Sequence, residues 1–309
     1  MRPAMFAVAA RGEAFTLATI AAARGGPRRP GAQMVVTADQ AWGFLSGGCI
    51  EEDVVGHARR TLADRQSRRL RYGRGSPYID MRLPCGGTID VLIQYVGAAD
   101  ADLARLRELG DARRPALWRD DAAGRRCVAG DAESDENSVL CRYEPSQQLL
   151  VVGSDPYALA IAALGQMTGW ETLLLAPFGP ARAPPHGIAC DRRPLAISLA
   201  DRRLDRWTAV AVATHDLELD EAALVPALRA DTGYVGVLGA RSKIPDRQRR
   251  LLAAGVPAPD IDRLHAPIGL PIDGHAPWEV AVAVIAEIVA ERAARQRSVA
   301  SVARQHAAA

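Results

Sequence analysis

One cysteine of this chain stands where residue types and spacing suggest chemistry. Cys49 follows Gly47 and Gly48 in the stretch GFLSGGCIEEDVV. Glycine tolerates backbone conformations that other residues avoid, and it lets a ligand approach the main chain closely. Ser46 can cap a helix predicted to follow, and the acidic run that starts at Glu51 suits the first turn of that helix. Cys49 would then lie near outward-pointing N–H groups, which favour a thiolate, although nearby acids oppose this and a packed apolar corner explains the cysteine equally well.

A second cysteine has a similar setting. Cys85 precedes Gly86 and Gly87 in PCGGTIDVLIQY, so we expect it at a turn before a strand over residues 88–96. If Cys49 and Cys85 converge in the fold, they form a candidate sulfur or metal site, because thiolates are soft metal ligands. The alternative is that one of the two is functional and the other is merely packed.

Several basic residues and histidines are candidates for binding anions. Arg28 lies in the loop GGPRRPG and could hold a phosphate by charge-assisted hydrogen bonds, although a solvated loop fits it nearly as well. Arg241 and Lys243 follow a predicted strand and open a helix, and Lys243 is the only lysine of the chain. Open α/β sheets bind ligands at such strand ends and helix starts. His215 stands at the end of a predicted strand, and His265 precedes the segment APIG. These histidines either line a cleft between the domains or serve as hydrogen-bonded turn residues.

The composition excludes several classes of protein. The chain has 309 residues, of which 49% are hydrophobic and 24% charged, and this suits a globular protein with two domains. Its formal net charge of +2 does not favour nucleic acid or an anionic membrane as a partner. No apolar run is long enough to span a bilayer, and we do not interpret the first residues as a signal peptide. The 5 cysteines include no C-x-x-C pair, which argues against a disulfide framework and a structural zinc site.

The first part of the chain, residues 1–145, is predicted to be a mixed α/β domain. Apolar residues at helical spacing indicate helices over 50–65 and 101–110. Runs rich in β-branched residues indicate strands over 14–20, 33–37, 42–46, 88–96 and 138–144, with a hairpin over 115–130.

The second part, residues 146–296, is predicted to be a Rossmann-like domain. Buried strands alternate with helical segments there, a pattern typical of a doubly wound parallel sheet. A closing helix is expected over 277–296. Residues 297–309 are predicted to form a flexible tail.

The first strand-to-helix turn of this domain departs from the dinucleotide fingerprint G-x-G-x-x-G/A. Gly153 and Ala158 match the first and last positions, but Asp155 replaces the glycine that lets the backbone approach a pyrophosphate. After the next strand, Ala176 stands near the place where an acidic residue would bind the ribose. Both changes together predict that conventional NAD(P) binding is lost or altered.

Six segments in order give the chain a resemblance to the XdhC/CoxI family of accessory proteins for molybdenum hydroxylases. The resemblance spans about residues 11–292, and one departure is Pro156, where the family tends to have a histidine. The segments are TLATIAAARGGPRRPGAQMVV, GFLSGGCIEEDVV, PCGGTIDVLIQY, VAVATHDLELDEAAL, GYVGVLGARSK and LHAPIGLPI.

The resemblance implies a cytoplasmic chaperone, not an enzyme. Such a protein holds molybdenum cofactor, as molybdopterin or its cytosine dinucleotide, while a cysteine desulfurase supplies a terminal sulfido ligand. It then delivers the cofactor to the large subunit of xanthine dehydrogenase or an aldehyde oxidoreductase. The family also implies a homodimer, with a molybdopterin nucleotidyltransferase as a further candidate partner. The cofactor-binding residues implied here, with Cys49 as the metal ligand, are Gly47, Gly48, Cys49, Glu51, Cys85, Gly86, Gly87, Arg28, His215, Arg241 and Lys243.

Two other functions compete with this hypothesis. An NAD(P)-dependent oxidoreductase rests on the analogy of the Rossmann-like domain alone, and the altered fingerprint counts against it. A scaffold that binds a partner enzyme without touching cofactor has no need of the glycine–cysteine motifs.

Overall fold

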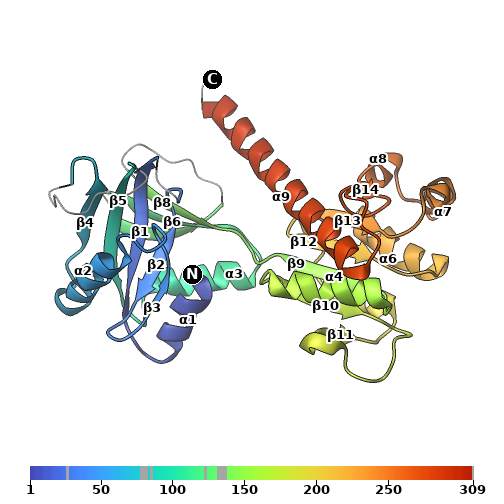
Figure 1. The fold of residues 1–309 in the computed structure, drawn as a ribbon, viewed down its shortest axis with the longest axis horizontal. Coiled ribbons are helices and arrows are strands. Elements are labelled where there is room, and N and C mark those ends of the chain that lie inside the picture. The colour runs from blue at the N-terminus through green and yellow to red at the C-terminus, as the bar shows by residue number, and fades with distance from the viewer. Residues whose placement is uncertain (26–27, 77–82, 84–85, 122–123, 131–137, 308–309) are drawn as a thin grey trace. The chain divides into compact units, whose positions relative to one another are not determined.

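The protein forms two compact units. In a computed structural model, the units are Met1–Pro145 and Ser146–Ala309 (Figure 1). The structure describes residues 1–25, 28–76, 83, 86–121, 124–130 and 138–307, with side chains as far as residue 297.

The first unit is built on an antiparallel sheet of five strands in the order β3-β2-β1-β5-β4. The strands predicted over 14–20, 33–37 and 88–96 are confirmed, whereas the one predicted over 42–46 ends at residue 43. The arginine-rich β4 alternates between more and less buried positions. The sequence does not predict this strand, because its arginines interrupt the run of β-branched and apolar residues that indicates one. The strands are β1 (Phe15–Arg24), β2 (Gln33–Val36), β3 (Ala41–Gly43), β4 (Arg68–Gly73) and β5 (Thr88–Val96).

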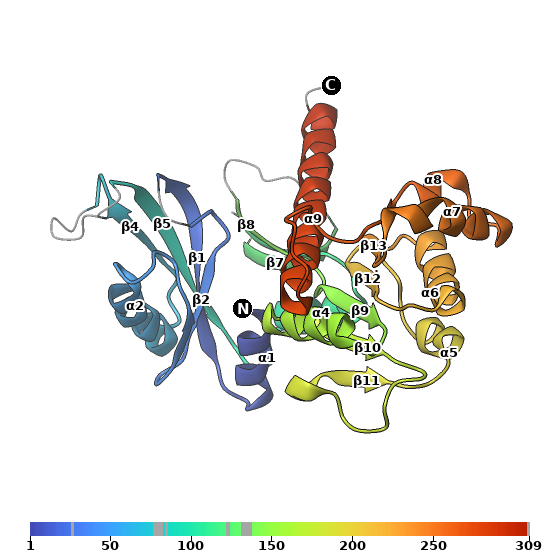
Figure 2. The same ribbon diagram turned by 45° about the vertical axis from the view of Figure 1, so that its right-hand side comes forward.

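Both faces of this sheet are covered, which explains why β1 reads as a nearly continuous apolar run. Ala18 and Ile20 join a core with helix α2 (Glu51–Asp64), and Phe15 and Leu17 join a second core on the other face. Figure 2 shows α2 on one side of the sheet. The second core contains α1 (Arg2–Ala10), α3 (Ala101–Asp111) and a sheet of β6 (Ala116–Asp121), β7 (Gly124–Ala129) and β8 (Val139–Tyr143).

The second unit is a doubly wound parallel sheet, as predicted from the sequence. Its strand order is β11-β10-β9-β12-β13-β14, so the chain reverses its direction of sheet growth between β9 and β12. Such a switch point is where open α/β sheets bind ligands. The strands are β9 (Gln148–Val152), β10 (Glu171–Leu175), β11 (Ala189–Asp191), β12 (Thr208–Val212), β13 (Tyr234–Val237) and β14 (Leu264–His265).

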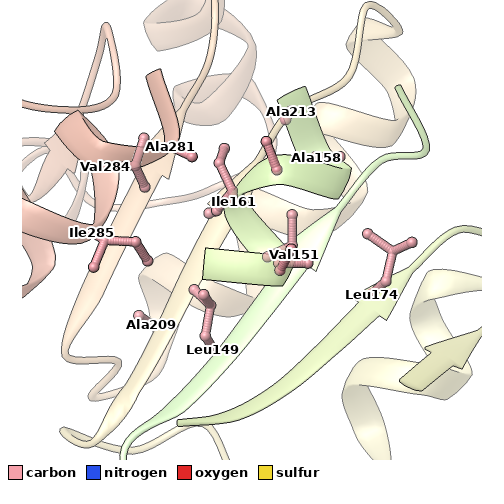
Figure 3. Packing of buried hydrophobic residues seen from close by; sticks show 14 of the residues in the cluster. Leu149, Val151, Ala158, Ile161, Leu174, Ala209, Ala213, Ala281, Val284 and Ile285 are labelled. Carbon is pink, nitrogen blue, oxygen red and sulfur yellow. The ribbon is translucent and has the colours of Figure 1, made fainter. Parts of the chain in front are cut away.

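Helices cover both faces of the parallel sheet. On one face, α4 and α9 pack on β9 through residues such as Ile161, Val284 and Leu149 (Figure 3). On the other face, α5, α6, α7 and α8 enclose a second apolar core. The helices are α4 (Pro156–Met167), α5 (Leu195–Ala200), α6 (Leu217–Arg229), α7 (Ile244–Ala253), α8 (Ala258–Ile261) and α9 (Pro277–Ala307), with short 3₁₀ turns η1 (Pro185–Gly187) and η2 (Arg241–Lys243).

The last helix differs from its prediction. The sequence predicts a helix over 277–296 followed by a flexible tail, but the structure continues α9 through residues 297–307. No glycine or proline interrupts the chain there, so nothing in the backbone forces the helix to end. Within the part of the chain that the structure describes, no helix is long and apolar enough to cross a membrane.

A buried ion pair fixes the carboxyl edge of the parallel sheet. Arg247 of α7 donates to Asp220 of α6 at 2.7 and 3.1 Å, and the two residues are 5% and 2% exposed. The other Asp220 oxygen accepts from the Thr214 hydroxyl at 2.5 Å, and Arg247 also donates to the Leu238 carbonyl at 3.0 Å. The loops after β12 and β13 are therefore held by one network.

We expect Asp220→Ala to destabilise the second unit by about 3–5 kcal/mol, because it leaves the Arg247 guanidinium buried without its charge partner. Urea unfolding followed by circular dichroism measures this loss. The matched control is Asp246→Ala, which breaks an exposed pair with Arg249 and should cost less than about 1 kcal/mol. Equal midpoints for the two variants would contradict the assigned role of the network.

Candidate functional site

The loop that carries Cys49 is organised around one carboxylate. Glu51 accepts hydrogen bonds from the backbone N–H groups of Leu45 at 2.8 Å, Ser46 at 2.6 Å, Gly47 at 3.1 Å and Gly48 at 2.8 Å. Successive N–H groups that converge on one point make a concave anion site, often called a nest. Here the anion is supplied by the chain itself.

Ser46 completes this arrangement. Its hydroxyl donates to Glu51 at 2.7 Å and accepts from the N–H groups of Cys49 at 3.0 Å and Ile50 at 3.3 Å. Ser46 therefore satisfies free N–H groups just ahead of α2, although the residue at the N-cap position is Ile50. Leu45 and Ile50 are buried and anchor both ends of the loop in the core beneath α2.

The hydrogen bonds determine the charge state of Glu51. Burial disfavours the carboxylate, but the bonds from Ser46, Leu45 and Gly47 outweigh burial and lower the pKa of Glu51 to about 2. Glu51 is thus ionised at neutral pH. The sequence predicts outward-pointing N–H groups around Cys49. The structure instead directs the amides of residues 45–48 to Glu51, the first residue of α2. The predicted contact of Glu51 with the cofactor stays a prediction.

The two glycines are needed for the shape of the loop and leave space above it. Gly47 and Gly48 have φ angles of +104° and +117°, which side-chain-bearing residues rarely adopt. A Cβ atom added to either would meet no atom within 4 Å, so the space there is open. Cys49 is exposed next to them. The loop therefore presents an accessible thiol beside an open stretch of main chain.

Helix α2 brings this loop to one end of the five-stranded sheet. One turn after Cys49, Asp53 accepts a hydrogen bond from the hydroxyl of the fully buried Tyr72 at 2.6 Å. Tyr72 is followed by Gly73, where an added Cβ would lie 2.0 Å from the Gly87 carbonyl oxygen. The first turn of α2 and the glycines before β5 are thus joined at the same end of the sheet.

The loop with Arg28 leaves the sheet at that end as well. Arg24, the last residue of β1, pairs with Thr88 at the start of β5, and an added Cβ on Gly25 would lie 3.6 Å from Gly87 Cα. Arg28 is exposed. Gly86 has a φ of +69° and open space around an added Cβ. The structure therefore places the start of the Arg28 loop, the first turn of α2 and residues 86–87 at the same end of the sheet, whereas Cys85 lies outside the described residues.

The other predicted residues belong to the second unit. The exposed Arg241 and Lys243 form η2 at the carboxyl end of β13. His215 follows β12, and its Nε2 lies 3.4 Å from Asp155 Oδ2. Among the residues that the structure describes, no group of three or more histidine, cysteine, aspartate or glutamate side chains could hold a metal ion.

His265 has a structural role in the second unit. This agrees with the alternative that it is a hydrogen-bonded residue. Its ring stacks on Tyr234 with 4.5 Å between centroids, and its Nδ1 lies 3.3 Å from Glu287. Burial disfavours the Glu287 carboxylate, but hydrogen bonds from His265, Tyr234 and the Gly269 N–H outweigh it and lower the pKa of Glu287. These contacts tie β13 and β14 to α9.

The altered fingerprint turn places a carboxylate at the start of α4. Asp155 is the N-cap, and its Oδ1 accepts from the Ala158 N–H at 2.8 Å. Gly153 has a φ of +140°, and an added Cβ there would lie 2.1 Å from the Ala213 carbonyl oxygen. The first glycine of the fingerprint therefore keeps its role in the tight turn, whereas the second glycine is replaced by Asp155. Asp155 preceding Pro156 is a recognisable cap signal. The sequence thus shows the missing glycine but not that the Asp155 side chain bonds to the N-terminus of α4.

Comparison with known proteins places the chain. Sequence models of the XdhC and CoxI family and of the XdhC Rossmann domain match residues 8–73 and 149–288, respectively. The chain is 30% identical over 287 residues to the molybdenum cofactor insertion chaperone PaoD of Escherichia coli K12, covering 91% of this chain and 84% of that protein. The chain belongs to the XdhC and CoxI family.

Other proteins resemble this XdhC and CoxI family member over half of the chain or over nearly all of it. A protein of Bacillus subtilis 168, named as a probable subunit of xanthine dehydrogenase, is 27% identical over 50% of this chain and 46% of its own length. A crystal structure described as that of a xanthine dehydrogenase from Bacillus halodurans superposes with a TM-score of 0.74 over 95% of this chain and 96% of that one, at 23% identity. That likeness shows the shared fold.

We expect Glu51→Gln to destabilise the folded chain by about 1–3 kcal/mol. The glutamine side chain would point its own N–H donors at loop N–H groups that need an acceptor. Folding lowers the pKa of Glu51 from 4.5 to about 2, so the carboxylate stabilises the fold fully above pH 4.5. This contribution is lost as the pH falls toward 2. The difference in melting temperature between wild type and variant should therefore be constant near neutral pH and shrink below about pH 4.5.

Differential scanning calorimetry from neutral pH downward measures both curves. Glu52→Gln is the matched control, since Glu52 is the exposed neighbour on the same turn and should change the melting temperature little. A stability difference that stays constant into the acidic range would mean that the Glu51 charge does not hold the loop.

Proposed function

We propose that this chain is an accessory chaperone that binds molybdenum cofactor and inserts it into a molybdenum hydroxylase of the xanthine dehydrogenase or aldehyde oxidoreductase type. The observation that carries the proposal is the relationship to PaoD, which is 30% identical and extends over 91% of this chain. A relationship of this extent includes both units, so it supports a shared role of the whole chain more than the borrowing of one domain.

The Cys49 loop supports the proposal chemically. Its exposed thiol is a soft ligand of the kind that suits molybdenum or a sulfur ligand on it, and the open main chain at Gly47 and Gly48 lets a flat ligand approach. Glu51 then positions the loop. The amides of this loop do not fit a phosphate, because they are bonded to Glu51. In our proposal, Arg28 at the same end of the sheet receives the phosphate or pyrophosphate instead.

A carrier must release its cargo, and a single exposed cysteine suits this need. Several buried ligands would close around a metal, whereas one thiol on a preformed loop can bind and let go without refolding. The proposal assigns the chain positioning and protection of the cofactor and gives it no catalytic residue. Either molybdopterin or its cytosine dinucleotide could be the form carried.

We extend the proposal to the partners of this step. The large subunit of the hydroxylase receives the cofactor, a cysteine desulfurase supplies its sulfido ligand while it is held, and a molybdopterin nucleotidyltransferase is the source of a dinucleotide form. We propose that the chain works as a homodimer in the cytoplasm. Its described cysteines, Cys49, Cys127, Cys141 and Cys190, are all free thiols, which suits a reducing compartment.

An NAD(P)-dependent oxidoreductase is the weaker alternative. The Rossmann-like unit supports it, but Asp155 puts negative charge where a pyrophosphate would approach. Asp191, the residue paired with Leu175 at the end of β10, forms ion pairs with Arg193 and Arg202. A scaffold without cofactor leaves the shape and exposure of the Cys49 loop unexplained.

We expect Cys49→Ser to abolish most cofactor retention and client activation while leaving the melting temperature within about 1 °C of wild type. Serine is nearly isosteric but is a poor soft-metal ligand and cannot carry a persulfide. The chain is mixed with molybdenum cofactor and desalted, and the retained pterin fluorescence, molybdenum content and activation of a client hydroxylase are measured.

Cys190→Ser is the control for this experiment, because Cys190 is half-buried in the second unit and far along the chain from the loop. It should retain cofactor as the wild type does. Full retention by Cys49→Ser would show that the thiol does not hold the cofactor, and failure of the wild type to retain cofactor would remove the carrier function.

We also expect NAD and NADP to bind no tighter than about millimolar in calorimetry, because the α4 N-terminus is already capped by a carboxylate. Asp155→Gly should raise the affinity about tenfold, since it frees the Ala158 N–H for a phosphate. Micromolar binding by the wild type would favour the oxidoreductase alternative.

A further inference from the structure

A cavity of about 350 Å³ lies at the switch point of the parallel sheet, and none of the described residues that line it belongs to the Cys49 loop. It opens where β9, β10 and β12 end. Ala176, Ala213 and Leu219 give it an apolar lining, and Phe178, which is 82% exposed, stands at it with a free aromatic face. A flat ring is the shape that such a lining accommodates, because aromatic faces stack on planar groups.

Both helix ends at this cavity are occupied by carboxylates of the chain. Asp155 caps α4, and Asp216 caps α6 by accepting from the N–H groups of Glu218 at 2.8 Å and Leu219 at 3.3 Å. Helix N-termini normally attract anions. Here their positive ends are neutralised, and two carboxylates line the cavity. The cavity therefore repels phosphates and favours a ligand that donates hydrogen bonds.

One acceptor in the cavity lacks a donor. Asp155 Oδ2 is buried and makes no hydrogen bond with the residues that the structure describes. His215 Nε2 lies 3.4 Å from this oxygen, but the His215 side chain is 80% exposed and so is little restrained. A buried carboxylate oxygen without a donor is costly, and a ligand N–H group would remove that cost.

We propose that this cavity binds a planar heterocycle with two adjacent N–H groups, the 2-amino-4-oxopyrimidine edge that pterins and guanine share. The carboxylate of Asp155 can accept two parallel N–H bonds, because Oδ1 keeps a lone pair beyond its bond from Ala158. The ring then lies along the apolar lining toward Phe178. Assigning the ligand to a pterin rests on the proposed function, whereas assigning it to a guanine nucleoside does not.

The test is calorimetry of the full-length chain with neopterin, guanosine and inosine. Inosine differs from guanosine only by lacking the 2-amino group, so it reports the N–H pair alone. We expect neopterin or guanosine to bind about ten- to a hundredfold tighter than inosine. Tight binding of neopterin with weak binding of guanosine identifies the ligand as a pterin, and the reverse order identifies it as a guanine nucleoside. Binding of neither above the level of inosine overturns the proposal.

Asp155→Asn separates the ligand contact from the helix cap. Asparagine caps helices as well as aspartate does, so the melting temperature should stay near that of wild type. It replaces one acceptor oxygen with a donor, and affinity for the tighter ligand should fall by about tenfold or more. Asp246→Asn, on the exposed side of α7, is the control and should bind as wild type does.

Unchanged affinity in Asp155→Asn would overturn the assignment of Asp155, even if guanosine bound better than inosine. The assay contains neither molybdenum nor a client enzyme. Its failure would therefore leave the carrier function of the Cys49 loop intact, and loss of that function would leave this binding result intact.

Discussion

The carboxylate of Glu51 is the interaction on which the cysteine loop depends. Four consecutive N–H groups, from Leu45 to Gly48, turn toward it, and they can do so only because two glycines adopt left-handed backbone conformations. An ionised side chain of the same loop thus replaces an external anion. The loop is shaped before any ligand arrives, and the cost of ordering it is met during folding.

Carboxylates fill anion sites in both units of this protein. In the first unit Glu51 occupies a nest, and in the second Asp155 and Asp216 cap the helices at the sheet edge. Main-chain N–H groups of the kind that bind phosphate are therefore already bonded to carboxylates of the chain. The fold keeps the architecture of a nucleotide-binding domain while its charges now favour ligands that donate hydrogen bonds.

The sequence predicted the parts of the structure that depend on local pattern. The β5 strand over 88–96 and the Rossmann-like alternation of strands and helices follow from runs of apolar and β-branched residues. In the sequence, Asp155 is interpreted only as a replacement for the second fingerprint glycine, and its role as the cap of α4 comes from the structure. The partner of the loop amides could not be predicted, because Glu51 also reads as an ordinary acid in the first turn of a helix. The grouping of the Arg28 loop with residues 86–87 depends on the pairing of β1 with β5, which no local pattern contains.

The pairing of β1 with β5 also orders events during synthesis. Phe15 pairs with Val96, so the central strand of the first unit waits for a partner made much later, and contacts between such distant segments form slowly. The Cys49 loop emerges between the two strands. On a nascent chain its thiol is therefore present before the sheet that frames it is complete.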